Sequence, residues 1–344
     1  MRPSVDRLFD WILSLGPTAR FNLTASGLPE PDLGGMGIDT SYESYAAAKD
    51  EHERLFAEEV ARLYGVDPEN VLLTNGGSEA IFLSYAVFAG RQVSVPLPNY
   101  PPMFTVPRSL GIEVRGASNG AAAADGTMFG VTDPNNPTGV SLSQDAVEAL
   151  LGYSKRNGST VYVNETYKEY TFPRRPQTLF GRADNVVTSN TMTKFFGLGR
   201  LRVGWVLAEE KKARRLLYAK WSVSGHDSGY SLWIAAQVLR RRAKFVERAR
   251  ETLRRNSSLV RGFLEETEGV SSELGAAPFC LVHYTRKTDS VTLARRLLKE
   301  TGVLVAPGDF FGAPRSFRLC FTADGPTIRN GLAALSEFFS RRSS

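Results

Sequence analysis

The feature that most constrains the fold is a regular alternation of strand-like runs and helix-like segments that begins near residue 50. The stretch EHERLFAEEVARLYG carries apolar residues at helical spacing and ends at Gly65, a typical residue for a helix C-terminus. Short apolar runs typical of strands follow at 71–73, 92–95, 112–114, 160–163, 186–189 and 203–207. Strands that alternate with helices predict an α/β fold of three layers, in which a mostly parallel sheet is covered on both faces.

The pattern changes after a long helix-compatible stretch at about 228–267. Strand-like and helical segments then follow at 279–284, 289–300, 303–305 and 316–321, before a last helix. We therefore expect a large α/β domain over residues 46–267 and a smaller α+β domain over residues 268–344. Residues 1–45 are too few for a domain of their own, and we expect them to pack with the smaller domain.

Composition places the chain among ordinary globular proteins, with 42% hydrophobic and 23% charged residues. No apolar run is long enough to span a bilayer, so we expect no membrane partner. The net charge of +6 owes most to arginines, many of them at 240–255, where apolar residues interrupt them as on a solvated helix face. No zinc-ligand spacing or RNA-binding signature accompanies these arginines, and we expect no nucleic-acid partner.

Cysteine and histidine usage adds two further expectations. Cys280 and Cys320 lie inside apolar runs and read as reduced core residues, which favours a cytoplasmic location. No metal site is expected, because no ligand spacing relates the three histidines, His52, His226 and His283.

The strongest chemical signal is the segment SNTMTKFFGLGRLRVGW at 189–205. Lys194 follows a strand-like run and precedes a glycine-rich turn. A lysine amine becomes nucleophilic toward aldehydes once its pKa is lowered. Thr191 and Thr193 can hydrogen-bond a phosphate, and Arg202 can pair with one through two parallel hydrogen bonds. A lone lysine is usually a surface residue, but these neighbours favour a site.

This segment resembles the cofactor-binding motif of the class I/II aminotransferases, the fold-type I enzymes that depend on pyridoxal 5′-phosphate. In that family a phosphate-binding arginine follows the lysine at the spacing that separates Lys194 from Arg202. The resemblance implies that Lys194 holds the cofactor as a Schiff base and moves the substrate proton, while Thr191 and Arg202 bind the phosphate. Arg200 stands where the family usually has glycine.

Three further segments resemble the same family, in the same order along the chain. TNGGSEAI leads from a strand into a helix whose free N–H groups suit an anion, and the resemblance assigns Gly77 and Ser78 to the phosphate. PLPNYPPMF resembles the P-x-Y-P element, which implies that Tyr100 stacks on the pyridine ring. DPNNPTG matches the N-P-x-G turn and gives Asn136 the phenolic oxygen of the ring. Each segment alone is also compatible with an ordinary turn or strand end.

The segment VYVNETY departs from the family pattern D-E-x-Y. Tyr167 matches the tyrosine that contacts the phenolic oxygen, but Asn164 stands where the family has an aspartate bonded to the pyridine nitrogen. That carboxylate keeps the ring protonated and strengthens it as an electron sink, whereas an amide supplies no charge. Glu165 cannot replace it, because neighbouring strand residues face opposite sides. An altered reaction, a degenerate family member and an introduced substitution are all compatible with Asn164.

Substrate contacts also follow from the resemblance. The segment at 303–321 is similar to the C-terminal lobe of aminotransferases, which implies that Arg318 binds the substrate α-carboxylate. TASGLPEPD resembles the stretch that closes over the substrate, and Gly27 is its candidate contact. Tyr45, or Tyr42 in its place, matches the tyrosine that reaches the cofactor phosphate of the other subunit, so a homodimer with shared active sites is implied.

The resemblance spans about residues 20–340 and implies an aminotransferase that moves an amino group between an L-amino acid and a 2-oxo acid. The stretch VAPGDFFG favours aspartate- and aromatic-type class I enzymes over histidinol-phosphate aminotransferases. The alternatives are a histidinol-phosphate aminotransferase or a pyridoxal-phosphate enzyme of another reaction type, namely elimination, replacement, cyclisation or decarboxylation. A catalytically degenerate cofactor-binding protein is the least favoured alternative.

Overall fold

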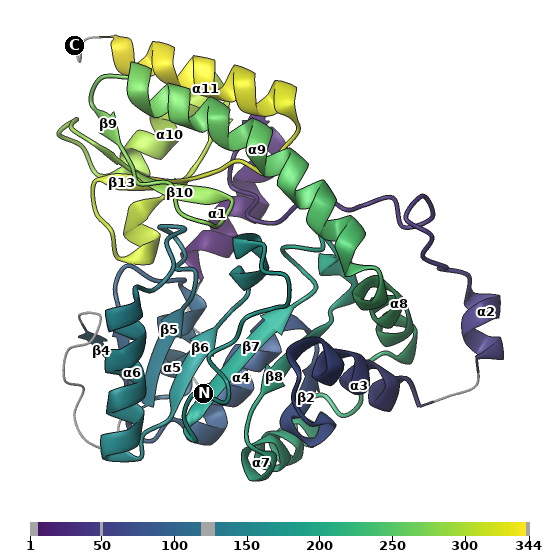
Figure 1. Cartoon of the computed structure of the whole chain (residues 1–344). Coiled ribbons are helices and arrows are strands. Elements are labelled where there is room, and N and C mark those ends of the chain that lie inside the picture. Colours follow the sequence, from purple (N-terminus) through teal and green to yellow (C-terminus); the bar gives the residue numbers. More distant parts are fainter. Residues whose placement is uncertain (1–5, 49–50, 118–127, 342–344) are drawn as a thin grey trace.

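The computed structural model describes residues 6–48, 51–117 and 128–341 (Figure 1). Within these ranges a seven-stranded sheet has the order β2-β8-β7-β6-β5-β3-β4. Its strands are β2 (Val71–Thr74), β3 (Gln92–Pro96), β4 (Glu113–Ala117), β5 (Met128–Thr132), β6 (Val161–Asn164), β7 (Val186–Thr191) and β8 (Gly204–Leu207). Only β8 runs against its neighbours β2 and β7, so the prediction of a mostly parallel sheet is confirmed.

Helices cover both faces of this sheet and make three layers (Figure 1). One face packs on α4 (Gly76–Phe88), α5 (Pro102–Ser109) and α7 (Glu210–Trp221). The other face packs on α3 (His52–Tyr64), α6 (Gln144–Asn157) and α8 (Gly229–Arg240). Successive side chains of a strand point to opposite faces of the sheet. Val161 and Val163 therefore join the core under α6, whereas Tyr162 joins the core under α4.

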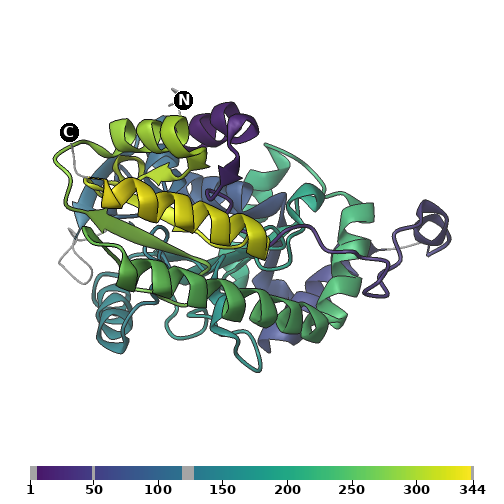
Figure 2. The same ribbon diagram turned by 90° about the horizontal axis from the view of Figure 1, so that it is seen from above.

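The C-terminal part of the described chain contains a four-stranded antiparallel sheet with the order β12-β13-β10-β9. Its strands are β9 (Val270–Ser271), β10 (Phe279–Tyr284), β12 (Ala306–Pro307) and β13 (Ser316–Cys320). The helices α9 (Arg242–Glu266), α10 (Ser290–Thr301) and α11 (Gly325–Ser340) pack around it, and α9 lies beside α11 in both views (Figures 1 and 2). Cys280 and Cys320 are buried free thiols in β10 and β13.

The N-terminal elements α1 (Arg7–Leu15) and β1 (Phe21–Asn22) lie against this C-terminal part. β1 pairs in parallel with β11 (Val303–Leu304), and Trp11 donates a hydrogen bond from Nε1 to the carbonyl of Val305 at 3.0 Å. By contrast, α2 (Tyr42–Ala47) projects from the body of the molecule next to α8 (Figures 1 and 2). These contacts support the predicted association of the N-terminal segment, while the domain boundaries stay predictions.

Two elements differ from expectation. The strand β5 was not predicted, because Gly130 interrupts its short apolar run; in the fold a Cβ at this position would collide with the hydroxyl of Tyr85. The helix-compatible stretch 228–267 forms two helices at a break that the sequence did not mark, since α8 ends at Arg240 and the N–H of its cap residue Arg241 is shared between the carbonyls of Gln237 and Val238. The predicted loop at 119–126 lies outside the described residues.

Short 3₁₀ turns complete the described chain at Gly16–Thr18, Pro68–Asn70, Lys168–Thr171, Gly199–Leu201 and Gly308–Phe311. Among the helices of the described ranges, none combines the length and the apolar character needed to cross a bilayer.

Candidate active site

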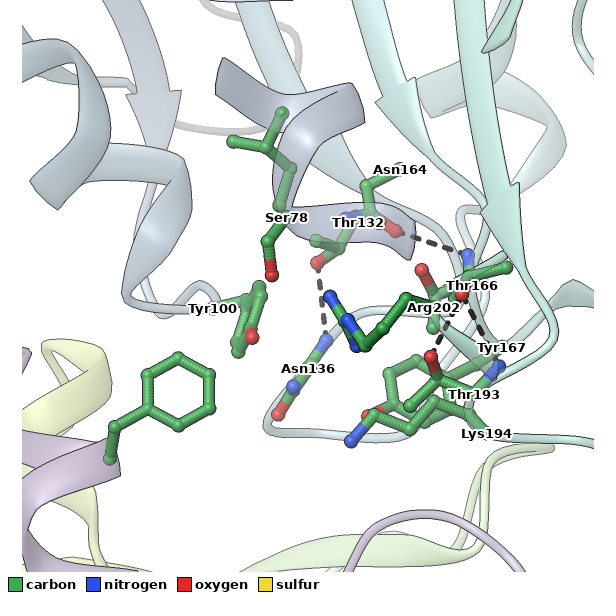
Figure 3. Close-up of a pocket in the computed structure, with 14 residues that line it drawn as sticks. Ser78, Tyr100, Thr132, Asn136, Asn164, Thr166, Tyr167, Thr193, Lys194 and Arg202 are labelled. Carbon is green, nitrogen blue, oxygen red and sulfur yellow. Dashed lines mark hydrogen bonds between the residues drawn. The ribbon is translucent and has the colours of Figure 1, made fainter. Parts of the chain in front are cut away.

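A pocket lies at the carboxyl ends of β2, β5, β6 and β7 (Figure 3). The loops that follow parallel strands meet at this edge of a sheet, which is where α/β proteins bind ligands. The described residues that line the pocket are Phe9, Gly77, Ser78, Ile81, Tyr100, Thr132, Asn136, Asn164, Thr166, Tyr167, Thr191, Thr193, Lys194 and Arg202. Nine of the twelve residues to which the resemblance assigns a role therefore lie together, as does Thr193, and Arg318, Gly27 and Tyr45 lie outside this lining.

Lys194 extends into the pocket from the loop after β7 (Figure 3). Its main chain is held on one side, because its carbonyl accepts hydrogen bonds from the N–H of Leu28 at 2.9 Å and from the hydroxyl of Tyr170 at 3.0 Å. Burial lowers the pKa of the Lys194 amine to about 8, and the positive charges of Arg318 and Arg202 act in the same direction. The amine is therefore closer to its neutral, nucleophilic form than an exposed lysine.

The N-terminus of α4 forms an anion cradle with Arg202. The side chain of the cap residue Asn75 accepts no hydrogen bond from the first-turn N–H groups of α4, so these N–H groups face the pocket without a capping partner. Arg202 crosses this helix start and donates from Nη2 to the carbonyl of Asn75 at 3.1 Å. Gly76 makes the crossing possible, because it has a φ of 77° and a Cβ there would lie 2.8 Å from Nη2 of Arg202. The Ser78 hydroxyl lies beside it (Figure 3).

Two threonines close the side of this cradle, and their hydrogen bonds distinguish them. The hydroxyl of Thr191 donates to the carbonyl of Val203 at 2.9 Å and lies 2.9 Å from the hydroxyl of Thr193. Since a hydroxyl has a single hydrogen, Thr193 is the donor in that second contact. The hydroxyl hydrogen of Thr191 is thus committed to a main-chain carbonyl, whereas Thr193 can donate to an anion by giving up only its bond to Thr191.

Asn164 and Tyr167 line the pocket from the end of β6. The N–H of Thr166 donates to Oδ1 of Asn164 at 3.1 Å (Figure 3). The hydroxyl of Tyr167 donates to the hydroxyl of Ser26 at 2.8 Å, and burial raises the pKa of Tyr167 to about 12 despite the opposing charge of Arg318. Tyr167 is therefore a neutral hydrogen-bonding group at physiological pH.

Glu165 lies between these two residues and faces the other way, as strand alternation predicted. Its carboxyl accepts a hydrogen bond from the N–H of Leu179 at 2.7 Å and does not line the pocket. Burial raises the pKa of Glu165 to about 7. Because it faces away, this carboxyl makes no contact with a group bound in the pocket.

Arg318 lies immediately behind the pocket lining, 2% exposed, between the rings of Phe279 and Phe311. It donates from Nη1 to Oδ1 of Asn136 at 2.9 Å and from Nη2 to the carbonyl of Thr24 at 3.0 Å. Its Nε has no hydrogen-bond partner among the described residues. A buried guanidinium with unused donors is suited to an anionic ligand.

Gly27 and Tyr45 occupy different surroundings. A Cβ on Gly27 would lie 3.1 Å from Cα of Lys194, so glycine lets the N-terminal segment pass against the lysine. Tyr45 stands on the projecting helix α2, away from the pocket. Its ring contacts four other aromatic rings, those of Tyr42, His52, Tyr230 and Trp233.

The sequence reasoning assigned no site role to Phe9, Ile81, Thr132 or Thr166. Thr132 and Thr166 adjoin the motifs that were recognised, and their position at strand ends could have pointed to them. Ile81 is one turn beyond Ser78 on α4. Phe9 carries no local signal, because it reaches the pocket from α1 through the folding of distant segments.

Known proteins share both this sequence pattern and this fold. An aspartate aminotransferase of Streptomyces avermitilis is 27% identical over 309 residues, which cover 80% of this chain and 76% of that protein. A capreomycidine synthase of Streptomyces vinaceus is 26% identical over 306 residues, covering 83% and 78%. The crystal structure of a PLP-dependent aminotransferase from Streptococcus suis superposes over the whole of both chains with a TM-score of 0.88 at 24% identity, which shows the shared fold.

The family assignment rests on the larger part of the chain. The sequence model of aminotransferase class I and II matches residues 49–335, from α3 to α11. The matched range contains the lysine loop, the anion cradle and Asn136, together with Arg318 behind the pocket. The chain therefore belongs to the class I and II aminotransferases, enzymes that use pyridoxal 5′-phosphate as their cofactor.

Proposed function

We propose that this aminotransferase holds pyridoxal 5′-phosphate in the pocket around Lys194 and there transfers an amino group between an L-amino acid and a 2-oxo acid. The observation that carries the proposal is the buried Lys194 amine, with its pKa lowered to about 8, beside a helix N-terminus and Arg202. An amine poised to attack an aldehyde and a cradle suited to a phosphate are the two features that this cofactor requires.

The residues present fit the cofactor. A dianionic phosphate matches the first turn of α4, where Gly77 and Ser78 adjoin the guanidinium of Arg202. Glycine is needed at the start of that helix for the guanidinium to approach, as the close contact of a Cβ at Gly76 with Arg202 shows. Tyr100 supplies an aromatic face for an aromatic ring, and burial raises its pKa well above the usual value, so it carries no competing charge.

The bound cofactor supplies an aldehyde and an electron-withdrawing ring. The residues of the chain would supply the groups that move the proton, bind the substrate and orient the ring. Lys194 would accept the proton from the substrate α-carbon and return it. Arg318 binds the substrate carboxylate with the donors that Asn136 and Thr24 leave unused. Asn136, whose N–H₂ group is free, would donate to the phenolic oxygen of the ring, and Tyr167 would do so once its hydroxyl turns from Ser26.

The proposal extends to the side chain of the substrate. Aspartate is the substrate favoured by the similarity to the Streptomyces avermitilis enzyme. Among the described lining residues the cations are Lys194 and Arg202, both already assigned to the cofactor. A second substrate carboxylate therefore requires a cation from outside this lining, such as one contributed by a second subunit.

A homodimer with shared active sites is also part of the proposal. The helix α2 projects from the molecule, and Tyr42 on it is 71% exposed. A projecting arm of aromatic residues is suited to reach another copy of the chain. In that assembly Tyr45 is the residue proposed to contact the cofactor phosphate of the partner subunit, with Tyr42 as the alternative. We place the enzyme in the cytoplasm, in keeping with its free buried cysteines.

A second candidate function is a different pyridoxal-phosphate reaction, such as a cyclisation. The observation that favours it is Asn164, which supplies no charge to the ring. The similarity to a capreomycidine synthase is compatible with this candidate.

Absorbance spectroscopy tests these proposals on the purified protein. Wild-type protein loaded with the cofactor is expected to be yellow, to keep the cofactor after borohydride reduction, and to carry the added mass on Lys194. The Lys194→Ala variant should take up no covalently attached cofactor. Adding single amino acids should then bleach the colour of the wild-type protein. A protein that binds no cofactor refutes the first proposal, whereas stable binding without bleaching by any amino acid favours the second candidate function.

A further inference from the structure

The side-chain amide of Asn164 has only one chemically sensible orientation. The backbone N–H of Thr166 lies 3.1 Å from Oδ1 of Asn164, and an N–H can donate but cannot accept. Rotating the amide by 180° would bring two donors together, so Oδ1 must face Thr166. The amide nitrogen Nδ2 consequently occupies the other branch of the side chain (Figure 3).

This amide nitrogen is left as a donor. Asn164 is 4% exposed and lines the pocket, yet its Nδ2 has no hydrogen-bond partner among the residues that the structure describes. The neighbouring strands place Thr132 and Ser189 at either side of Asn164 in the ladder. The hydroxyl of Ser189 is paired with Tyr162, and that of Thr132 with Asn99. Because Asn164 lines the pocket, its unpaired N–H₂ group can donate to an acceptor bound there.

The geometry of the cofactor identifies that acceptor. The aldehyde carbon and the ring nitrogen stand at opposite positions of the six-membered ring. In the view of Figure 3 Asn164 lies at the upper edge of the pocket and the Lys194 amine at the lower edge, while Ser78 lies to one side of both. With its aldehyde at Lys194, the ring therefore directs its nitrogen toward Asn164. This step rests on the proposed function, since it needs the cofactor in this pocket.

We propose that Asn164 donates a hydrogen bond from Nδ2 to the pyridine nitrogen and holds that nitrogen without a proton. A protonated ring nitrogen is itself a donor, and facing Nδ2 it would leave two donors opposed in a buried site. An unprotonated nitrogen accepts the bond and satisfies both groups. Asn164 is thus a positioning residue that also sets the charge of the ring.

The charges around the ring agree with this assignment. The ionisable groups of the described lining are Tyr100, Tyr167, Lys194 and Arg202, and no carboxylate is among them. Glu165 is the nearest carboxyl along the strand, but it faces the opposite side and accepts from the N–H of Leu179. With no carboxylate in the described lining, the chain places no negative charge there that would favour a proton on the ring nitrogen.

A neutral ring changes what the enzyme can do. Without its proton, the ring withdraws less negative charge from the bound substrate when the bond to the α-proton breaks. The chain therefore depends more on its own groups, Lys194 above all, to accept and return that proton. Removal of the substrate α-proton should therefore be slower than on a ring whose nitrogen carries a proton.

Nitrogen-15 NMR of protein loaded with ring-labelled pyridoxal 5′-phosphate tests the proposal directly. Free labelled cofactor at low and high pH calibrates the shifts of the protonated and unprotonated nitrogen. The wild-type holoenzyme should show the unprotonated shift throughout the pH range in which it is stable. Asn164→Asp, which keeps an acceptor for Thr166, should move the signal to the protonated shift. The matched control Glu165→Gln, one residue away on the opposite face, should leave the signal unchanged.

The possible outcomes distinguish a failure of the role of Asn164 from a failure of cofactor binding. A protonated shift in the wild-type holoenzyme overturns the role of Asn164, whatever the variants do. A wild-type protein that takes up no cofactor at all overturns the proposed function instead. The wild-type spectrum decides the question alone if the Asn164→Asp variant does not fold.

Discussion

Nη1 of Arg318 donates a hydrogen bond to Oδ1 of Asn136 at 2.9 Å and thereby joins β13 to the loop that follows β5. The two residues are far apart in the sequence, and the bond is buried. Because Oδ1 of Asn136 is the acceptor in this bond, its amide N–H₂ is free to donate into the pocket. The same contact thus orients a ring-binding amide and holds the guanidinium proposed to bind the substrate carboxylate.

Arg318→Lys should weaken substrate binding more than it slows the chemical step. Lysine offers a point charge in place of a planar fork, so the bonds to Asn136 and to the substrate cannot be made together. Loss of one hydrogen bond to a charged group costs about 1.5–3 kcal/mol, which corresponds to a rise in KM of roughly 10- to 150-fold. Steady-state kinetics of both variants, with the exposed Arg329→Lys as control, measures this. An unchanged KM would argue against the role of Arg318.

The pH dependence of cofactor attachment should reflect the lowered pKa of Lys194. The amine attacks the aldehyde in its neutral form, so the rate of covalent loading of apoprotein should rise with pH and level off above about pH 8. Stopped-flow absorbance after mixing apoprotein with cofactor follows this rate. A midpoint near the ordinary value of 10.5 would show that the amine is exposed to water in solution.

Lys220→Met should strongly destabilise the fold beneath the phosphate cradle. Lys220 is buried between Glu79, at 3.1 Å, and Asp227, at 2.8 Å. Methionine would leave both carboxylates without their cation. Removing one partner of a buried ion pair costs about 3–5 kcal/mol of folding stability. Glu79 also accepts from the N–H of Asn75 at 2.6 Å, so the cradle itself should loosen and bind the cofactor more weakly. Urea denaturation of the apoprotein measures the free energy of unfolding.

The control for this change is Lys211→Met, an exposed position on the same helix α7. It should alter the free energy of unfolding by less than about 0.5 kcal/mol. Equal effects of the two substitutions would mean that the buried pairs contribute nothing beyond the loss of a surface charge.

Glu165→Gln should flatten the pH dependence of stability. The pKa of Glu165 is raised from 4.5 to about 7 by burial, so its contribution to stability is fully present below about pH 4.5 and is lost as the pH rises to about 7. That shift corresponds to roughly 3 kcal/mol. Glutamine keeps the acceptor for the N–H of Leu179 and does not ionise, so the variant should be more stable than wild type at pH 8. Urea midpoints at both ends of this range provide the comparison, and parallel pH profiles would contradict it.

Tyr45→Phe should lower the affinity for the cofactor if Tyr45 reaches the phosphate of the partner subunit. Loss of a hydrogen bond to a charged group predicts a Kd higher by roughly 10- to 150-fold. Tyr42→Phe, on the same helix, is the matched comparison. Fluorescence titration of apoprotein with pyridoxal 5′-phosphate distinguishes the two, and a loss of affinity in Tyr42→Phe alone would transfer the role to Tyr42.

Local features of the chain were predictable because they depend on neighbouring residues. The spacing of Lys194 and Arg202 spans one loop and turn, and the strand alternation that turns Glu165 away from the pocket is a property of a single strand. The mostly parallel sheet followed from the order of strand-like and helical segments. The strand β5 escaped prediction because Gly130 weakens its apolar pattern, and only the packing of Tyr85 explains why glycine is needed there.

The sequence by itself determined that a glycine-rich helix start, an Asn-Pro turn and a lysine occur in the order of a pyridoxal-phosphate enzyme, and that Asn164 replaces the expected carboxylate. Only the tertiary structure decided that the amide of Asn164 must donate, that Arg318 contacts Asn136 and that Phe9 reaches the pocket. These last relationships depend on how strands and helices pack together. A hydrogen bond has a direction and a length, and both are defined only once the whole chain has brought its two partners together.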